Sequence, residues 1–368
     1  YSKLGQPEQA YSLLLPLREW VDSHAPDDLR SLWYGYWAAT LGHLGRLREA
    51  VACFEVCIAA IERVGRRDAT GAAVVNLGVV LRAMGRLAAA FEVSQRALSL
   101  MSDDPQATSS RTLARLTHAR DQAETGRFAD ALQAFEDLGP RLQAMGGGFW
   151  TVAMQTTWAT MWLHLGQFAR AQQALAGHDD SATPAFMRSS RQLLHMEIAN
   201  WLGRPVPQTM VADAQAMVAA DPGRIAGAAV RALRAATPDQ VLAEVPTWID
   251  RSLAQERYGV ALAARVHETR AALQLGQLDR AASAARAALA LVAQGYAPDA
   301  MYGPEVQLVA WRALSAVGAA DEARQALFAG ADWVRQQALP QVPPAFIDAF
   351  LHRNPVNRDL LAAAAQLR

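Results

Sequence analysis

The side chains with which most enzymes do chemistry are not gathered into a catalytic motif in this chain. The eight histidines are dispersed over 368 residues, with no close pair. Neither a His-Glu-x-x-His zinc motif nor a Gly-x-x-x-x-Gly-Lys-Ser/Thr phosphate loop occurs in the sequence. We therefore expect no catalytic residue, no cofactor and no metal site, and we predict that the protein is not an enzyme.

The two cysteines are the best candidates for metal ligands, and their context favours packing instead. Cys53 and Cys57 are four residues apart, so in a helix they share a face and could supply half of a metal site. No second pair completes the site, and buried free cysteine behaves as a small hydrophobic residue. So low a cysteine count rules out a disulfide framework and is typical of a reducing compartment, so we expect a cytoplasmic protein.

Charged and aromatic side chains recur at fixed distances before a series of glycines. At six residues before the glycine, or at two or three before it, the chain has His43, Arg82, Arg120, His164, Glu197, Trp201, Arg270 and Arg312. A guanidinium group binds carboxylate or phosphate through two parallel hydrogen bonds. If these eight residues line one wall, we expect the wall to bind an extended acidic or amphipathic peptide, or a small anion. The alternative is that the arginines are solvated or paired with neighbouring carboxylates.

An internal repeat of about forty residues sets this spacing. Its glycines are Gly5, Gly45, Gly85, Gly126, Gly166, Gly203, Gly276 and Gly318. Apolar residues at helical spacing flank most of them, and an alanine usually follows five residues later. Because glycine ends a helix in a left-handed conformation, each period is predicted to be a helix hairpin whose apolar faces only its neighbours can cover. Between Gly203 and Gly276, we expect Thr237-Pro238-Asp239 to supply a missing turn.

The clearest copy of the repeat resembles the tetratricopeptide repeat. It contains Asn76-Leu77-Gly78, Gly85, Ala90 and Ala97-Leu98. The resemblance implies an all-α, right-handed α-solenoid of about eight antiparallel helix hairpins, in which the first helix of each pair lines a concave wall. It also implies a protein or peptide partner. The period exceeds the family's usual length of about 34 residues, and such long repeats resemble those of large ATP-binding bacterial regulators of the maltose-regulator (LuxR-related) type.

The last residues, 343–368, are predicted to form a capping segment on the repeat array of residues 1–342. They contain Ala349-Phe350-Leu351 and Asn354-Pro355-Val356-Asn357-Arg358. These motifs resemble the end of the tetratricopeptide arrays in bacterial ATPase regulators and multidomain adenylate cyclases. The sequence also opens inside a hairpin, at Leu4-Gly5, so we expect an ATPase or effector domain upstream in the same chain.

Charge and hydropathy narrow the range of partners. The chain has 35 basic and 35 acidic residues, without the basic excess that contacts to nucleic acid require. It also lacks an apolar stretch of about 18 residues, so no membrane span is expected.

The leading interpretation is a sensor or scaffold module of a larger bacterial signalling or transcriptional regulator, which binds a peptide, a protein or a small anionic inducer on its concave surface. One alternative is a free-standing adaptor or chaperone-type binding protein. Another is an enzyme that uses His164 and Glu197.

Overall fold

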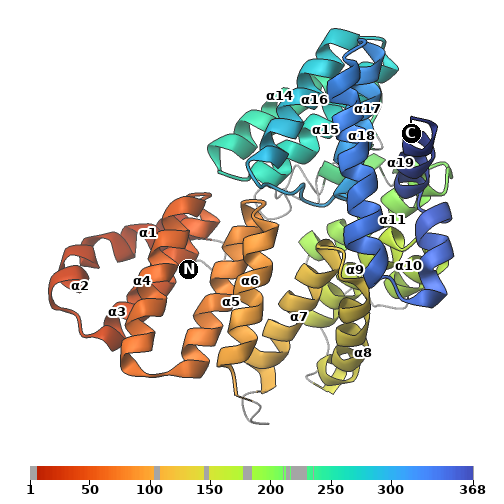
Figure 1. Cartoon of the computed structure of the whole chain (residues 1–368). Coiled ribbons are helices and arrows are strands. Elements are labelled where there is room, and N and C mark those ends of the chain that lie inside the picture. Colours follow the sequence, from red (N-terminus) through yellow and green to blue (C-terminus); the bar gives the residue numbers. More distant parts are fainter. Residues whose placement is uncertain are drawn as a thin grey trace. The chain divides into compact units, whose positions relative to one another are not determined.

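The computed structural model describes residues 6–102, 108–144, 149–176, 185–209, 211–212, 216, 230–234 and 236–367. Within these residues every regular element is helical, and neighbouring helices pack in chain order, so the fold is an all-α, tetratricopeptide-like solenoid (Figure 1). The chain divides into two compact units. Unit 1 consists of residues 1–121 and 251–258, and unit 2 of residues 122–250 and 259–368.

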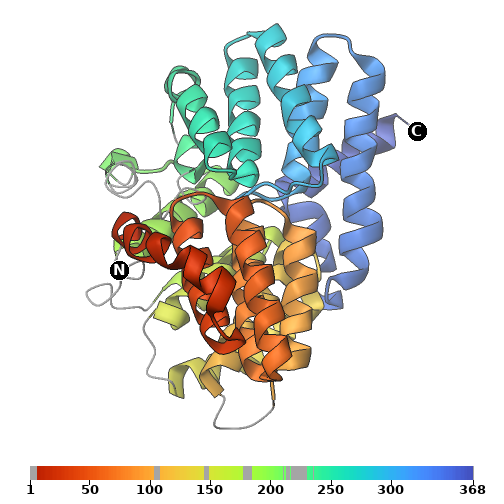
Figure 2. The same ribbon diagram turned by 90° about the vertical axis from the view of Figure 1, so that its left-hand side faces the viewer.

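Unit 1 is a row of antiparallel helices joined by short turns (Figure 2, red to orange). Its helices are α1 (Pro7–Leu14), α2 (Arg18–His24), α3 (Asp27–His43), α4 (Leu47–Val64), α5 (Arg67–Ala83), α6 (Leu87–Leu100) and most of α7 (Thr108–Glu124). Helix α3 packs against α4, α4 against α5, and α5 against α6. The core between them contains Trp37, Phe54, Cys57 and Leu77. The packing role predicted for Cys57 is confirmed, since this residue is 3% exposed.

The repeated glycines end their helices in the predicted way. Every one of them from Gly45 to Gly318 has a positive φ, between 65° and 85°, whereas Gly5 lies outside the described residues. At Gly45 the turn is closed by hydrogen bonds from Gly45 N–H to the carbonyl of Gly42 (3.2 Å) and from Arg46 N–H to that of Leu41 (2.9 Å). This geometry satisfies the last carbonyls of the helix, and glycine adopts it without steric cost.

Unit 2 contains the remaining helices. They are α8 (Phe128–Ala144), α9 (Phe149–His164), α10 (Phe168–Leu175), α11 (Ala185–Trp201), α14 (Pro238–Ala254), α15 (Tyr258–Gln274), α16 (Leu278–Ala293), α17 (Pro304–Ala316), α18 (Ala320–Asp332) and α19 (Pro355–Gln366). A 3₁₀ turn, η5 (Val230–Arg234), precedes α14, and π-helical turns cover Trp333–Ala338 and Ala349–Arg353. The ends of α14 and α15 that face each other, residues 251–258, belong to unit 1.

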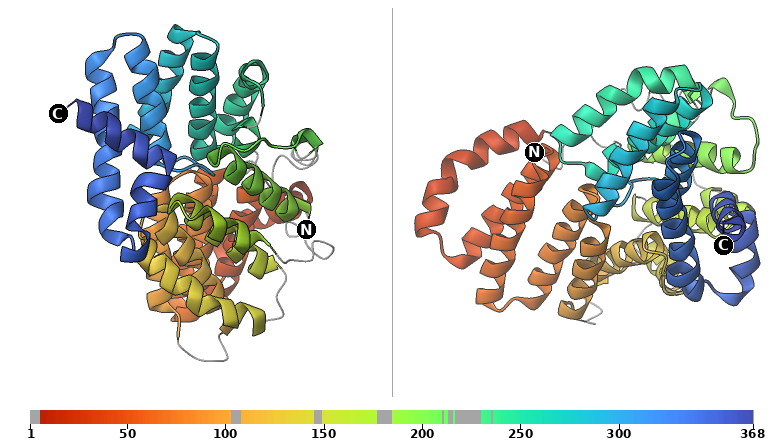
Figure 3. Two further views of the ribbon diagram at one scale, coloured as in Figure 1. Left: turned by 90° about the vertical axis from the view of Figure 1, so that its right-hand side faces the viewer. Right: turned by 45° about the horizontal axis from the view of Figure 1, so that its top comes forward.

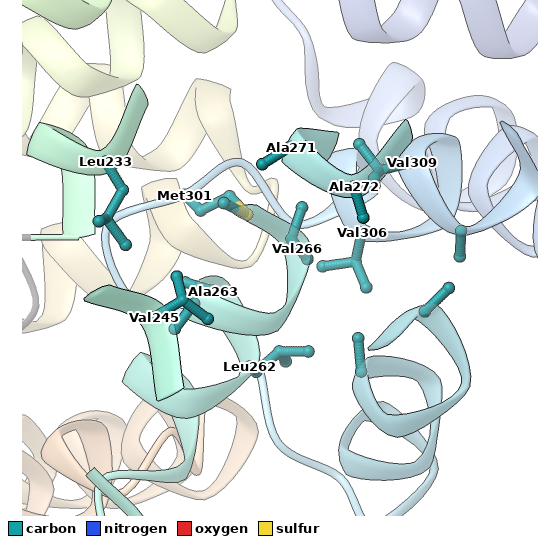
Figure 4. Close-up of a cluster of buried hydrophobic side chains, with 14 of the residues drawn as sticks. Leu233, Val245, Leu262, Ala263, Val266, Ala271, Ala272, Met301, Val306 and Val309 are labelled. Atoms are coloured by element: carbon teal, nitrogen blue, oxygen red, sulfur yellow. The ribbon is translucent and has the colours of Figure 1, made fainter. Parts of the chain in front are cut away.

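Alanine and valine side chains form the main core of unit 2 (Figure 4). Val245 from α14, Val266 from α15, Ala285 from α16 and Val309 from α17 all belong to this cluster. Helices α17 and α18 pack against each other, and α19 contacts both (Figure 3, blue). Small side chains at these positions let the helices approach closely, which is how a hairpin array buries its apolar faces.

The break predicted at Thr237-Pro238-Asp239 lies between η5, which ends at Arg234, and α14, which begins at Pro238. Thr237 caps α14: its hydroxyl accepts a hydrogen bond from Gln240 N–H (3.4 Å), and the Gln240 side chain accepts one from Thr237 N–H (3.0 Å). This is a capping box, which marks the start of a helix. A further turn, between α14 and α15, lies at Glu256, which has a φ of 56°. A search for glycines could not find it, because here a carboxylate residue adopts the left-handed conformation.

Candidate functional site

The first helix of each hairpin in unit 1 exposes one stripe of side chains. This stripe consists of the residues that lie 13, 9, 6 and 2 positions before the turn glycine. A helix places these four positions on one face. We call it the first-helix face: Leu32, Tyr36, Ala39 and His43 on α3, and Ala72, Asn76, Val79 and Ala83 on the neighbouring α5.

Large apolar side chains on this face are open to solvent. Leu32 and Tyr36 are each 56% exposed, and Val79 is 49% exposed. His43, which we predicted to bind ligand, is exposed beside them on α3. Ala39 and Val79 lie six residues before Gly45 and Gly85, so the spacing used in the sequence analysis includes them, whereas it does not include Leu32 and Tyr36. The signal was present, because both residues lie on the same helical stripe as Ala39, one and two turns earlier.

The two arginines predicted on the wall of unit 1 are less open. Arg82 donates from Nε to Oδ1 of Asp121 (3.0 Å), and the Arg82 side chain is only 11% exposed. Asp121 is fully buried. For Arg82, the structure therefore shows the alternative of pairing with a neighbouring carboxylate. Arg120 is half-buried on α7.

In unit 2 the same helical stripe is covered on α9 and α11. His164 is 7% exposed, and its ring centroid lies 4.6 Å from that of Tyr302 and 6.2 Å from that of Trp201. Trp201, expected to be exposed on the inner wall, is instead half-buried and also packs against Phe168. Burial lowers the pKa of His164 to about 3, so the ring is a neutral part of an aromatic cluster at pH 7.

Glu197 belongs to a buried charge cluster, which we define as Glu197, Arg231, Arg234, Arg270 and Glu305. Glu197 is 2% exposed and accepts a hydrogen bond from Arg231 Nε (2.6 Å). The guanidinium Nη2 of Arg234 lies 3.7 Å from Oε1 of Glu197 and donates a hydrogen bond to Oε2 of Glu305 (2.8 Å). Arg270 donates to the other carboxylate oxygen of Glu305, Oε1. Each carboxylate thus contacts two arginines.

The electrostatics of this cluster favour a charged carboxylate at Glu305 and a neutral imidazole at the neighbouring His267. Burial by itself raises the pKa of Glu305, but Arg234 and Arg270 more than offset this effect and lower it to about 2. His267, one turn before Arg270, accepts a hydrogen bond from Arg270 at Nδ1 (3.4 Å). Burial, together with the adjacent Arg270, holds the pKa of His267 well below 6.5. The cluster therefore carries three positive and two negative charges at pH 7.

A cavity of about 280 Å³ adjoins the charge cluster. Its lining residues come from η5, from the start of α14 and from α15: Leu233, Arg234, Ala236, Pro238, Val241, His267, Arg270, Ala271 and Gln274. On α15, His267, Arg270 and Gln274 lie nine, six and two residues before Gly276. These positions are equivalent to those of the first-helix face in unit 1, but on α15 they line this cavity.

The eight predicted residues thus fall into separate environments. In unit 2, Glu197 and Arg270 join one cluster through Arg234 and Glu305, whereas His164 and Trp201 meet at Tyr302. Arg312 lies on the surface, where it forms an ion pair with Asp359 (2.7 Å). Three members of the charge cluster were missed. Glu305 was detectable, because it lies on the same stripe as Arg312, whereas Arg231 and Arg234 come from a segment without a repeat signal.

Neither cysteine has the properties of a reactive or metal-binding group. Both are free thiols, and burial raises the pKa of the Cys57 thiol to about 11. Across the described residues, no group of three or more histidine, cysteine, aspartate or glutamate side chains could hold a metal ion. The helices in this part of the chain also include none that is long and apolar enough to cross a membrane.

Comparison with known proteins supports the repeat assignment. Residues 28–103 match the family model described as tetratricopeptide repeat. This stretch includes α3 to α6, and with them the whole first-helix face of unit 1. A search of curated proteins found no match. Tetratricopeptide repeats are generally protein-interaction modules and not enzymes, so the match supports a scaffold that binds protein.

Proposed function

We propose that the protein is a scaffold or sensor module whose first-helix face in unit 1 binds an amphipathic segment of a partner protein. The observation that carries this proposal is the exposure of Leu32, Tyr36 and Val79 on two neighbouring helices. Clustered exposed apolar side chains are typical of interaction surfaces. The three residues also lie within the stretch that matches the tetratricopeptide repeat.

The chemistry of the face favours a partner with apolar anchors. Tyrosine is enriched among the residues that dominate binding energy at interfaces, since its large ring loses little conformational entropy. His43 and Asn76 add hydrogen-bonding groups at the edge of the apolar row. We infer that the bound segment presents apolar side chains at regular spacing to α3 and α5, with polar groups facing solvent.

A peptide selected from a random displayed library tests this proposal, with its affinity measured by fluorescence anisotropy. We expect Tyr36→Ala to weaken binding about tenfold or more, in line with the loss of an interface anchor, and Val79→Ser to weaken it less. Val56→Ser is the matched control, because Val56 is 38% exposed but lies on α4, outside the first-helix face. If the enriched peptides bind equally well to wild type, Tyr36→Ala and Val79→Ser, this face is not the binding surface.

We also propose that the module belongs to a larger bacterial signalling or transcriptional regulator in the cytoplasm. The long repeat period and the closing motif Asn354–Arg358 support this context, as does the absence of a disulfide framework. The coding sequence upstream of Tyr1 tests it: an ATPase or other effector domain in the same reading frame is the expected result. Additional helical repeats ending in a polar cap would instead favour the free-standing adaptor.

A further inference from the structure

The cavity beside the charge cluster of unit 2 combines two arginines with apolar side chains. Arg234 and Arg270 line it, and both contact the same carboxylate, Glu305. Arg234 also lies near Glu197, so it stands between the two carboxylates of the cluster. His267, on the same wall, is held neutral and adds no further charge.

One arginine also has a hydrogen-bond donor to spare. The Arg234 side chain is only 12% exposed. Among the described residues, its Nε is buried and has no hydrogen-bond partner. Leaving such a donor unsatisfied away from water is costly. An oxyanion in the cavity would supply the missing acceptor. Arg270, which is 27% exposed, is the more accessible of the two cations.

Apart from Arg234, Arg270, His267 and the amide of Gln274, the cavity wall is apolar. Leu233 and Ala271 belong both to the wall and to the main core (Figure 4), and Val241 and Ala236 complete this side. A volume of about 280 Å³ lies just below the usual range of about 300–1,000 Å³ for pockets that hold drug-sized ligands. The space therefore suits a small molecule with a short apolar body.

We propose that this cavity binds a small organic anion, with a carboxylate or phosphate group against Arg234 and Arg270 and an apolar body against Leu233, Val241 and Ala271. Arginine pairs with both groups in the same planar, two-bonded geometry. This inference deepens the sensor part of the proposed function by naming its ligand class. Its residues are separate from the first-helix face of unit 1, so the two proposals can fail independently.

Calorimetric titrations with benzoate, phenyl phosphate and benzamide at constant ionic strength test the ligand class. Benzoate and benzamide have nearly the same shape and differ in charge. We expect saturable binding of at least one anion, and binding of benzamide that is tenfold weaker or more. Equal binding of benzoate and benzamide, or no binding of either anion up to about 10 mM, would overturn the proposal.

Variants test the place of binding. Arg270→Gln should weaken binding of the anion tenfold or more, because it removes the accessible cation. The matched control is Arg286→Gln, which breaks the exposed ion pair of Arg286 with Glu322 (2.7 Å) on α16 and should leave affinity unchanged. If Arg270→Gln does not fold, Ala236→Leu, which fills the cavity from a half-buried position, decides the question. Wild-type affinity in the folded variants would overturn the assignment, while peptide binding through Tyr36 reports separately on unit 1.

Discussion

Glu305 shows how strongly a single carboxylate can depend on its neighbours. It is 3% exposed at the start of α17, and it contacts Arg234 from η5 and Arg270 from α15. A charge buried in this way is stable only while it is paired. The residue therefore joins three elements of unit 2 through charge as well as through packing.

Replacing this carboxylate should be costly. Glu305→Gln leaves Arg234 and Arg270 near each other without their shared anion, and breaking a buried pair from one side typically costs about 3–5 kcal/mol. We expect the free energy of unfolding in urea to fall by about 3 kcal/mol. Glu322→Gln is the matched control, because Glu322 pairs with Arg286 on an exposed surface; it should leave the urea midpoint nearly unchanged. Equal losses in both variants would contradict the role of the cluster.

For single residues, the spacing in the sequence predicted which side chains share a helical stripe, but not which of them are covered by other parts of the chain. Counting back from the turn glycines identified Val79, Arg270 and Arg312 as members of one stripe. It could not show that His164 is covered by Tyr302, or that Glu197 is covered by Arg231, because these partners come from distant segments. A repeat period contains information about local helix geometry only, so whether its stripe is open or covered depends on tertiary packing.

The turns between helices differ in how much they tolerate a side chain, although they share one conformation. Gly166 has a φ of 70°, and a Cβ added there would lie 3.0 Å from the carbonyl carbon of Ala349 and 3.1 Å from the amide nitrogen of Asn354. Gly318 has a φ of 72°, and its Cβ would meet nothing within 4 Å. Of these two turns, therefore, only the one at Gly166 is closely covered by another part of the backbone.

We predict that Gly318→Ala costs only the left-handed strain of a non-glycine residue, about 1–2 kcal/mol. Gly166→Ala should cost clearly more, because the backbone of residues 349–354 must also move. Thermal unfolding of the two variants measures the difference. Equal melting temperatures would show that the segment around Asn354 does not pack tightly on the turn after α9.

Helix turns were the elements most accurately predicted from the sequence. Each described glycine of the repeat adopts the expected positive φ, because few other residues occupy this region without strain. The break at Thr237, where the repeat lacks a glycine, has a different physical cause. A polar residue followed by proline can either end a structured segment or cap the next helix, and only the position of Gln240 three residues later distinguishes the two.

For the whole molecule, acid should destabilise the fold through its buried histidines. An unfolded His164 takes up a proton below a pH of about 6.5, whereas the folded residue has a pKa of about 3. The unfolded state therefore binds more protons between these values, so stability is highest above pH 6.5 and falls as pH falls. His267, whose pKa is also lowered, acts in the same direction.

Urea unfolding at pH 5, 6 and 7 measures this dependence. We expect His164→Phe, which keeps an aromatic ring against Tyr302, to reduce the slope by up to about 1.4 kcal/mol per pH unit. The Glu305 carboxylate, with a pKa of about 2, loses its contribution only below pH 4.5, outside this range. A His164→Phe variant with an unchanged slope would rule out a contribution from this imidazole.

The hydrogen bonds of Asn354 affect how the chain can fold during its synthesis. Its buried amide donates a hydrogen bond to the carbonyl oxygen of His164 (2.7 Å), and its side-chain oxygen accepts from the amides of Val356 and Asn357 at the start of α19. These contacts join residues 190 positions apart. Asn354 must therefore leave the ribosome before α9 acquires this partner, so α9 stays incompletely packed, and exposed to aggregation, while the next 190 residues are made.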